Sequence, residues 1–249
     1  LELAATQLEL LALAQLYRRL VQSVNTDANS VGPTLMGILD TAMRDSQAQS
    51  SVQASLAWSW SLLTEAERAV LAQCALFVSG FDVEAAEAVV KLAEPNAPPL
   101  MGLLQSLRSR NLLRIRTPFA GCRRLSVPRL VGAFALAHGQ RGELDEAQLR
   151  MAQHFSAMGT EAQIFQRKSS GVLHRRIAKL EVPNIQHCFE WAMNHHHAEL
   201  SAMLSLAALA LLKTTGPFDG VTEMLRRANL ALDEDAPLKP RVLLEQSRL

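Results

Sequence analysis

The strongest chemical signal in this sequence is a run of arginines in a stretch without acidic residues, between Glu94 and Glu143. A guanidinium group can bind two oxygens of one phosphate, so several arginines without acidic neighbours suit contact with DNA phosphates or with a nucleotide. The candidate phosphate or DNA contacts are Arg108, Arg110, Arg114, Arg116, Arg123, Arg124 and Arg129, and Arg141 lies in the same run. The alternative is that these side chains face solvent or another domain of the same protein.

Three adjacent histidines, His195, His196 and His197, are the next group that could do chemistry. Adjacent side chains on a helix project about 100° apart, so the three cannot converge on one metal ion. They are more typical of a polar helix end and the loop that follows it. We therefore predict no metal-ligating residues.

Two further groupings could act in nucleophilic catalysis: His138 with Asp145 and Ser126, and His187 with Cys188. Neither has a recognisable nucleophile motif such as Gly-x-Ser-x-Gly. The chain also lacks the Gly-x-x-x-x-Gly-Lys-[Ser/Thr] loop that holds nucleotide phosphates. We predict that the chain is not an enzyme and has no catalytic or cofactor-binding residues of its own.

Composition predicts a folded intracellular protein. Of 249 residues, 49% are hydrophobic and 20% charged, and the net charge of +1 does not indicate a globally basic nucleic-acid binder. Three widely separated cysteines argue against a disulfide framework or a zinc site and favour a reducing compartment. The longest apolar stretch, 200–212, is shorter than the about 20 residues needed to span a bilayer. We expect a cytoplasmic chain with no membrane segment, and the absence of Met at position 1 suggests a piece of a longer protein.

Residues 51–142 are predicted to form one compact unit. Thr64 and Glu67 have the spacing of a capping box, which marks the start of a helix. Residues alternate in type near 112–116 and 124–127, with a turn between them, which predicts a β-hairpin. The expected helices are 51–60, 65–77 (ended by 79–80), 83–92, 100–109 and 128–138. Three helices followed by a hairpin is the order of a winged helix.

The rest of the chain is predicted to be helical. Residues 1–50 are expected to hold helices at 1–24 and 35–43 with a polar loop between them. Residues 143–249 are expected to form an α-helical, TPR-like repeat region. Its expected helices are 143–158, 172–180, 184–194, 198–212 and 220–232. The predicted fold class is therefore mainly α, with one short β-hairpin.

Several segments resemble the bacterial signal-transduction ATPases with numerous domains (STAND), relatives of AfsR-type and LuxR-type regulators that carry an NB-ARC-like module. The most specific similarity is in 55–68 and 77–89, which resemble the winged-helix region of that family. Looser similarity covers 1–5, 103–113 and 180–192, the last at the start of the family's helical repeats. The resemblance spans most of the chain.

This resemblance implies that ATP and Mg²⁺ bind in a domain upstream of the chain, and that residues 1–50 are a remnant of the ATPase lid. Nucleotide exchange there would move the winged helix as a rigid body, while the repeats bind a protein or small-ligand partner and bias the switch. The chain would be a non-catalytic regulatory fragment in signal transduction or transcription regulation. DNA contact is the less favoured role, since the family uses its winged helix mainly as an internal lever.

One position departs from the family. A histidine–acid pair often follows the second strand of the wing, where the histidine contacts the nucleotide, and this sequence has Pro128 and Arg129 there. Either nucleotide sensing is weak, or Arg129 faces a phosphate. Two other classes of protein also remain open: a DNA-binding winged-helix transcriptional regulator, and a protein-interaction scaffold of helical repeats.

Overall fold

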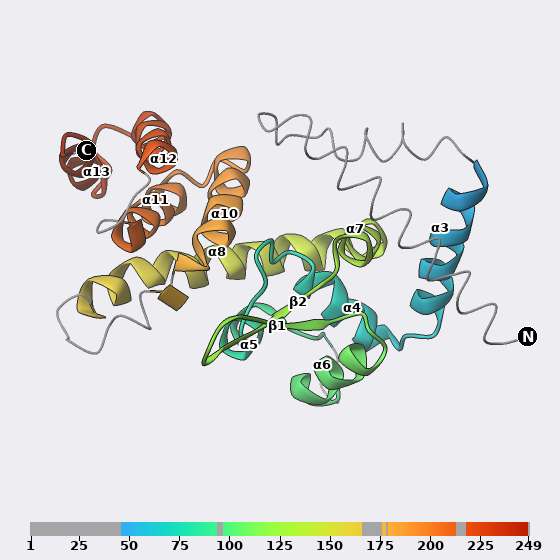
Figure 1. The fold of residues 1–249 in the computed structure, drawn as a ribbon. Helices are drawn as coiled ribbons and strands as arrows, with labels where there is room; N and C mark the ends of the chain where they lie inside the picture. Colours follow the sequence, from blue (N-terminus) through green and yellow to red (C-terminus); the bar gives the residue numbers. More distant parts are fainter. Residues whose placement is uncertain (1–45, 94–96, 166–175, 178, 213–217, 249) are drawn as a thin grey trace, which may run out of the picture. The chain divides into compact units, whose positions relative to one another are not determined.

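The structure, a computed structural model, describes residues 46–93, 97–165, 176–177, 179–212 and 218–248 (Figure 1). The chain divides into two compact units, Leu1–Trp58 and Ser59–Leu249. In the first unit only the greater part of α3 (Ser46–Ser61) is described. The helices predicted over 1–24 and 35–43 therefore lie outside the described residues. The helix predicted over 51–60 begins earlier than expected, at Ser46.

The second unit begins with the short helices of the predicted winged helix. They are α4 (Glu65–Cys74), α5 (Val83–Val89) and α6 (Leu100–Ser109), with α7 (Arg129–His138) after the hairpin. The predicted capping box is confirmed: the Glu67 N–H donates to the Thr64 hydroxyl, and the Thr64 N–H donates to the Glu67 carboxylate. The predicted end of this helix at 79–80 is wrong. It ends at Cys74, and the chain turns there to bury Phe77 and Phe81, whose rings lie 4.6 Å apart.

The hairpin consists of β1 (Arg114–Phe119) and β2 (Cys122–Ser126), paired antiparallel. Arg114 lies opposite Ser126, and Arg116 lies opposite Arg124. The strands extend further toward the turn than predicted, and Gly121 takes the positive φ of 81° that the tight turn requires.

A third extended segment pairs with the other side of β2. Phe81 forms an antiparallel bridge to Leu125, with backbone hydrogen bonds of 2.8 and 2.7 Å. The strand β2 therefore lies between Phe81 and β1, which leaves β1 at the edge.

The remaining helices form the helical array. They are α8 (Arg141–Phe165), α10 (Val182–Asn194), α11 (Ala198–Leu212), α12 (Asp219–Ala231) and α13 (Lys239–Gln246). The sequence did not predict α13, and most of the helix predicted over 172–180 lies outside the described residues. Helix α11 is buried along almost its whole length, as its apolar composition predicts, and packs against α8, α10 and α12.

The long helix α8 joins the two parts of this unit. It packs against α4 and α5 of the winged helix and against α10 and α11 of the array (Figure 1). Buried residues from both parts belong to one continuous hydrophobic cluster, with Phe155 of α8 in edge contact with Phe77. Burial of apolar surface is the main favourable term in folding, so this shared core couples the stability of the two parts.

The mainly α fold with one short hairpin is confirmed. The division at residues 142 and 143 and the TPR-like regularity of the array stay predictions. No helix within the described ranges is long and apolar enough to cross a membrane.

Candidate functional site

Two of the predicted arginines meet in a depression between the C-terminal end of α6 and the start of β1. Arg108 and Arg114 line it, and its volume is about 560 Å³. The other lining residues are Gln105, Ser109, Asn111, Leu113 and Ile115, so no acidic side chain faces the depression. Asn111 has a left-handed φ of 60°, which turns the chain from the helix into the strand. This arrangement of guanidinium, amide and hydroxyl groups suits an anion.

The other exposed arginines are spread over different elements. Arg116 lies two residues beyond Arg114 along β1, so both side chains leave the same face of the strand. Arg124 of β2 lies opposite Arg116, so the two side chains leave the same face of the hairpin. Neighbouring residues of a strand alternate between faces, so Arg123 leaves the opposite face. Arg110 lies near a carboxylate, with its Nε atom 3.8 Å from Glu67.

The buried carboxylate of Glu67 is held in its charged form. Burial alone would raise the pKa of Glu67. Hydrogen bonds from Ser106 and Thr64 and the charge of Arg110 outweigh it, so the pKa lies below its usual value. The N-terminal cap of α4 is thereby linked to α6, and Arg110 takes part in this local structure.

Arg129 and Arg141 begin the helices α7 and α8, and both side chains are exposed. No described residue forms a hydrogen bond or ion pair with the Arg129 guanidinium. Pro128 is the N-cap residue of α7 and provides no side-chain cap. The structure thus places Arg129 at a helix N-terminus, in the segment where the family often has its histidine–acid pair.

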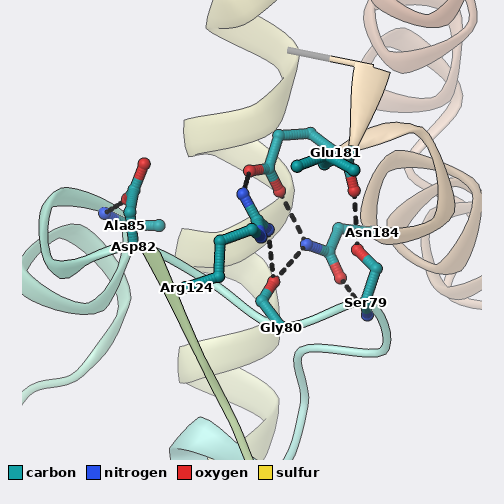
Figure 2. Close-up of polar contacts among 8 residues, drawn as sticks. Ser79, Gly80, Asp82, Ala85, Arg124, Glu181 and Asn184 are labelled. Carbon is teal, nitrogen blue, oxygen red and sulfur yellow. Dashed lines mark hydrogen bonds and ion pairs between the residues drawn. The ribbon is translucent and has the colours of Figure 1, made fainter. Parts of the chain in front are cut away.

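Arg124 is not on the surface where the sequence placed it. Its side chain is only 3% exposed, and it points from β2 to the start of α10 (Figure 2). One terminal nitrogen pairs with the carboxylate of Glu181, and the other donates to the carbonyl of Gly80 at 2.6 Å. Its Nε atom has no hydrogen-bond partner in the described part of the chain. Arg124 is therefore committed to an internal ion pair and does not face a phosphate.

Asn184 of α10 completes this buried network. Its amide donates to the carbonyl of Gly80 at 3.0 Å and to Glu181 at 2.7 Å, and its oxygen accepts from the N–H of Ser79 at 3.1 Å. The Ser79 hydroxyl also donates to the carbonyl of Leu180 at 2.8 Å. Figure 2 shows Arg124 and Asn184 both pointing to the carbonyl of Gly80. The loop 79–80 and the strand β2 of the winged helix are thus tied to the first turn of α10.

Gly80 is the residue that this arrangement requires. Its φ is +82°, and a Cβ atom there would lie 2.6 Å from the carbonyl oxygen of Leu125. A side chain would therefore meet both an unfavourable backbone conformation and a backbone atom that cannot move away. The glycine lets the loop approach β2 closely enough for its carbonyl to accept from both Arg124 and Asn184.

The end of the wing has a second contact with the array side. The guanidinium of Arg176 lies 4.4 Å from the centre of the Phe119 ring, a cation–π contact. Arg176 precedes α10 in the chain, and Phe119 is the last residue of β1. The hairpin is therefore held at its base by Arg124 and near its turn by Phe119.

The histidine run ends a helix, as predicted. Helix α10 ends at Asn194, and His195 is its C-cap residue. His195 and His197 both stack on the ring of Trp191, at 4.5 and 5.3 Å. No group of three or more potential metal ligands comes together among the residues that the structure describes.

The pairs considered for nucleophilic catalysis are engaged elsewhere. A ring nitrogen of His138 lies 2.8 Å from the carbonyl oxygen of Phe134, and Ser126 is buried in β2. The thiol of Cys188 is buried, and this burial raises its pKa to about 12. The neighbouring His187 is exposed, so the two side chains leave α10 on different faces. A buried thiol with a raised pKa is a weak nucleophile at neutral pH.

A second depression, of about 360 Å³, lies between α4 and the junction of α7 and α8. Trp60, Arg68 and His138 are among its lining residues, together with Glu65 and Glu143. Arg68 already donates to the carbonyls of Trp60 and Ser61, which fixes the end of α3. Trp60 contacts Phe134 and His138 and packs against the core, whereas Trp58 is 67% exposed.

Sequence reasoning missed the partners of Arg124. Glu181 and Asn184 lie within 180–192, which was noted only for its resemblance to the start of the family's repeats. Their spacing of three residues places them on neighbouring positions of one helical turn, where both can reach the same group. That spacing was the available signal, but it does not indicate which residue of the winged helix they bind.

Comparison with known proteins shows similarity to regulators. The chain is 28% identical over 166 residues to "Putative HTH-type transcriptional regulator Mb0914c" of Mycobacterium bovis. The same values hold for "Putative HTH-type transcriptional regulator Rv0890c" of Mycobacterium tuberculosis. The match covers 65% of this chain but only 18% of each relative. No family model matches the chain, and no solved structure matches it at a significant level. The similarity supports a regulatory role.

Proposed function

We propose that this chain is the transmitting segment of a cytoplasmic, STAND-type transcription regulator. A nucleotide-binding domain on its N-terminal side would supply the switch, with ATP and Mg²⁺ as its cofactors. The winged helix and the helical array would move together as one lever, and the array would bind a protein or small-ligand partner that biases the switch. The residues of this chain take no catalytic step in this proposal.

The observation that carries the proposal is the docking of the wing on the array. Arg124, Glu181 and Asn184 are all buried, and together they tie β2 and the loop at Gly80 to the first turn of α10. Removing one partner while the other charge stays buried costs about 3–5 kcal/mol, so the position of the wing on the array depends on all three residues. A lever needs such a contact, because a loose joint would dissipate a movement imposed at one end.

The geometry of α6 favours a lever over a reader of DNA sequence. In a helix-turn-helix protein, the N-terminal residues of the recognition helix contact the base edges. Here α6 follows Pro98 and Pro99 and begins with Leu100, Met101 and Gly102. These residues offer no side-chain donor or acceptor for a base. The wing is also held by the array at Arg124 and Phe119.

Arg129 is the residue through which nucleotide sensing can be tested. Two hypotheses remain: nucleotide sensing in this protein is weak, or Arg129 binds a phosphate in place of the family's histidine. Binding of labelled ATP to the full-length protein, with and without Arg129→Ala, separates them. A clear loss of affinity in the variant supports the phosphate role, and unchanged affinity contradicts it.

The lever is tested by a reporter gene under the control of the full-length protein. We expect Arg124→Met to abolish the ligand-dependent change in transcription while ATP binding upstream is kept. The matched control is Arg123→Met, which removes the same charge from the exposed face of the same strand and should leave the response intact. A milder variant, Arg176→Gln, should weaken the response without a risk of unfolding. A normal response in both Arg124→Met and Arg176→Gln contradicts the proposal.

A second role, contact with DNA, is favoured by one observation. The depression between α6 and β1 carries two guanidinium groups and no acidic residue. The relatives are named as putative HTH-type transcriptional regulators, which is consistent with a protein that binds DNA. This role is compatible with the lever, since the depression involves neither Arg124 nor the residues at the start of α10.

A further inference from the structure

We propose that the C-terminal end of α6 and the strand β1 form a contact surface for the phosphate backbone of duplex DNA that is independent of base sequence. The surface consists of Arg108, Arg114 and Arg116 with the neutral side chains of Gln105 and Asn111. The inference rests on the second role proposed above, contact with DNA. It specifies which residues make that contact and excludes base reading by α6.

Within the part of the chain that the structure describes, the charges on this surface have no carboxylate partner. Arg108 and Arg114 line one depression, and no carboxylate lines it with them. The nearby Arg110 differs, because its Nε atom lies 3.8 Å from Glu67. Like charges held together in this way repel one another, and a bound anion relieves that repulsion.

The spacing of the arginines suits a chain of anions better than a single compact one. Arg114 and Arg116 leave the same face of an extended strand, so their Cα atoms are about 6.6 Å apart. Arg108 adds a third guanidinium beside Arg114 at the end of α6. Successive phosphates of a DNA backbone can contact all three guanidinium groups, whereas a single phosphate ion can contact only some of them.

Position in the fold favours DNA over an acidic protein segment. In helix-turn-helix proteins the recognition helix lies against the major groove of the duplex, and α6 is the third of the short helices that precede the hairpin. Gln105, Ser109 and Asn111 are amides or hydroxyls, which commonly contact phosphates and sugars in protein–DNA complexes. The exposed start of α6, with Met101 45% exposed, provides no polar group for the bases. The contact is therefore with the backbone alone.

The test measures binding of the 249-residue chain to a fluorescent 20-base-pair duplex of random sequence between 50 and 200 mM KCl. Each phosphate contact adds about 0.9 to the slope of log affinity against log salt. Three contacts predict that affinity falls roughly 40-fold over this range. Arg108→Gln with Arg114→Gln leaves one contact, so the fall should shrink to roughly 3- to 4-fold. AT-rich and GC-rich duplexes should bind within about twofold of each other.

The matched control is Arg123→Gln with Arg241→Gln, which changes the net charge by the same amount at two exposed positions outside the surface. It should keep the salt dependence of the unchanged chain. Equal effects of the two double variants would overturn the proposed surface while leaving the DNA role standing. Absence of duplex binding would overturn both the surface and the DNA role, but not the lever.

Two competitors identify the occupant. A ten-residue polyglutamate peptide that displaces the duplex at equal charge concentration would show that the surface takes an acidic protein segment, and would overturn the proposal. Inorganic phosphate that displaces it at millimolar concentration would show a single-anion site, with the same consequence. The proposal requires that an unlabelled duplex compete far better than either.

Discussion

Replacement of Arg124 by Met is the perturbation whose effect can be estimated most directly from the structure. The methionine keeps most of the length of the side chain but removes the guanidinium that pairs with Glu181 and Gly80. The carboxylate of Glu181, whose side chain is 4% exposed, is then left with the Asn184 amide as its remaining hydrogen-bond donor among the described residues. An unpaired buried charge of this kind costs about 3–5 kcal/mol in the free energy of unfolding. For a unit of this size, that corresponds to a fall in melting temperature of roughly 6–20 °C.

The assay is urea unfolding of the 249-residue chain followed by circular dichroism. Arg123→Met serves as the control and should change the free energy of unfolding by no more than about 0.5 kcal/mol, because Arg123 is exposed. A double variant, Arg124→Met with Glu181→Leu, removes both charges and should recover much of the loss. A loss below about 1 kcal/mol for Arg124→Met, or no recovery in the double variant, would refute the reasoning.

Four further predictions follow from single residues. Gly80→Ala should lower the free energy of unfolding by at least about 2 kcal/mol in the same urea assay, because a Cβ atom there meets a backbone oxygen at 2.6 Å in a left-handed conformation. Thr64→Ala should cost about 1 kcal/mol through loss of the cap of α4, measured by thermal melting. Cys188 should react with a thiol reagent only after unfolding, since burial raises the pKa of its thiol to about 12; modification of the native chain at that residue, seen by mass spectrometry, would contradict this. In the folded state the pKa of Glu67 lies below its unfolded value near 4.5. The stability that this provides is present above that unfolded pKa and is lost as the pH falls through the lower folded pKa. Glu67→Gln should therefore flatten the dependence of the free energy of unfolding on pH in that window.

The local elements of the winged helix could be predicted because their signals lie within a few residues of each other. Thr64 and Glu67, which are three residues apart, mark the start of α4. The helix predicted over 100–109 agrees with α6 at both ends. The turn of the hairpin was predicted too long, since Pro118 suggested a break. The strand β1 lies at the edge of its sheet, where a proline is tolerated because no partner strand is needed on its outer side.

The candidate site could be predicted only in part. The acid-free run includes Arg108 and Arg114, which are close in sequence and line one depression where α6 turns into β1. It also includes Arg124, whose role depends on Glu181, 57 residues later in the chain. Exposed and buried arginines look alike in a sequence, and only the tertiary contact distinguishes them. The helix α13 lies beyond the last helix expected, although Pro240 near its start is compatible with the first turn of a helix.

The most direct test of the lever is a distance measurement between the winged helix and the array. Spin labels at Met101→Cys of α6 and Leu230→Cys of α12 would be introduced in the full-length protein, since both positions are exposed and the buried thiols of Cys74, Cys122 and Cys188 should not react. We predict one narrow distance distribution that is the same with and without ATP, and a broad one when Arg124→Met is added. A distance that shifts on nucleotide binding, or a distribution unchanged by Arg124→Met, would contradict the claim that the two parts move as one body.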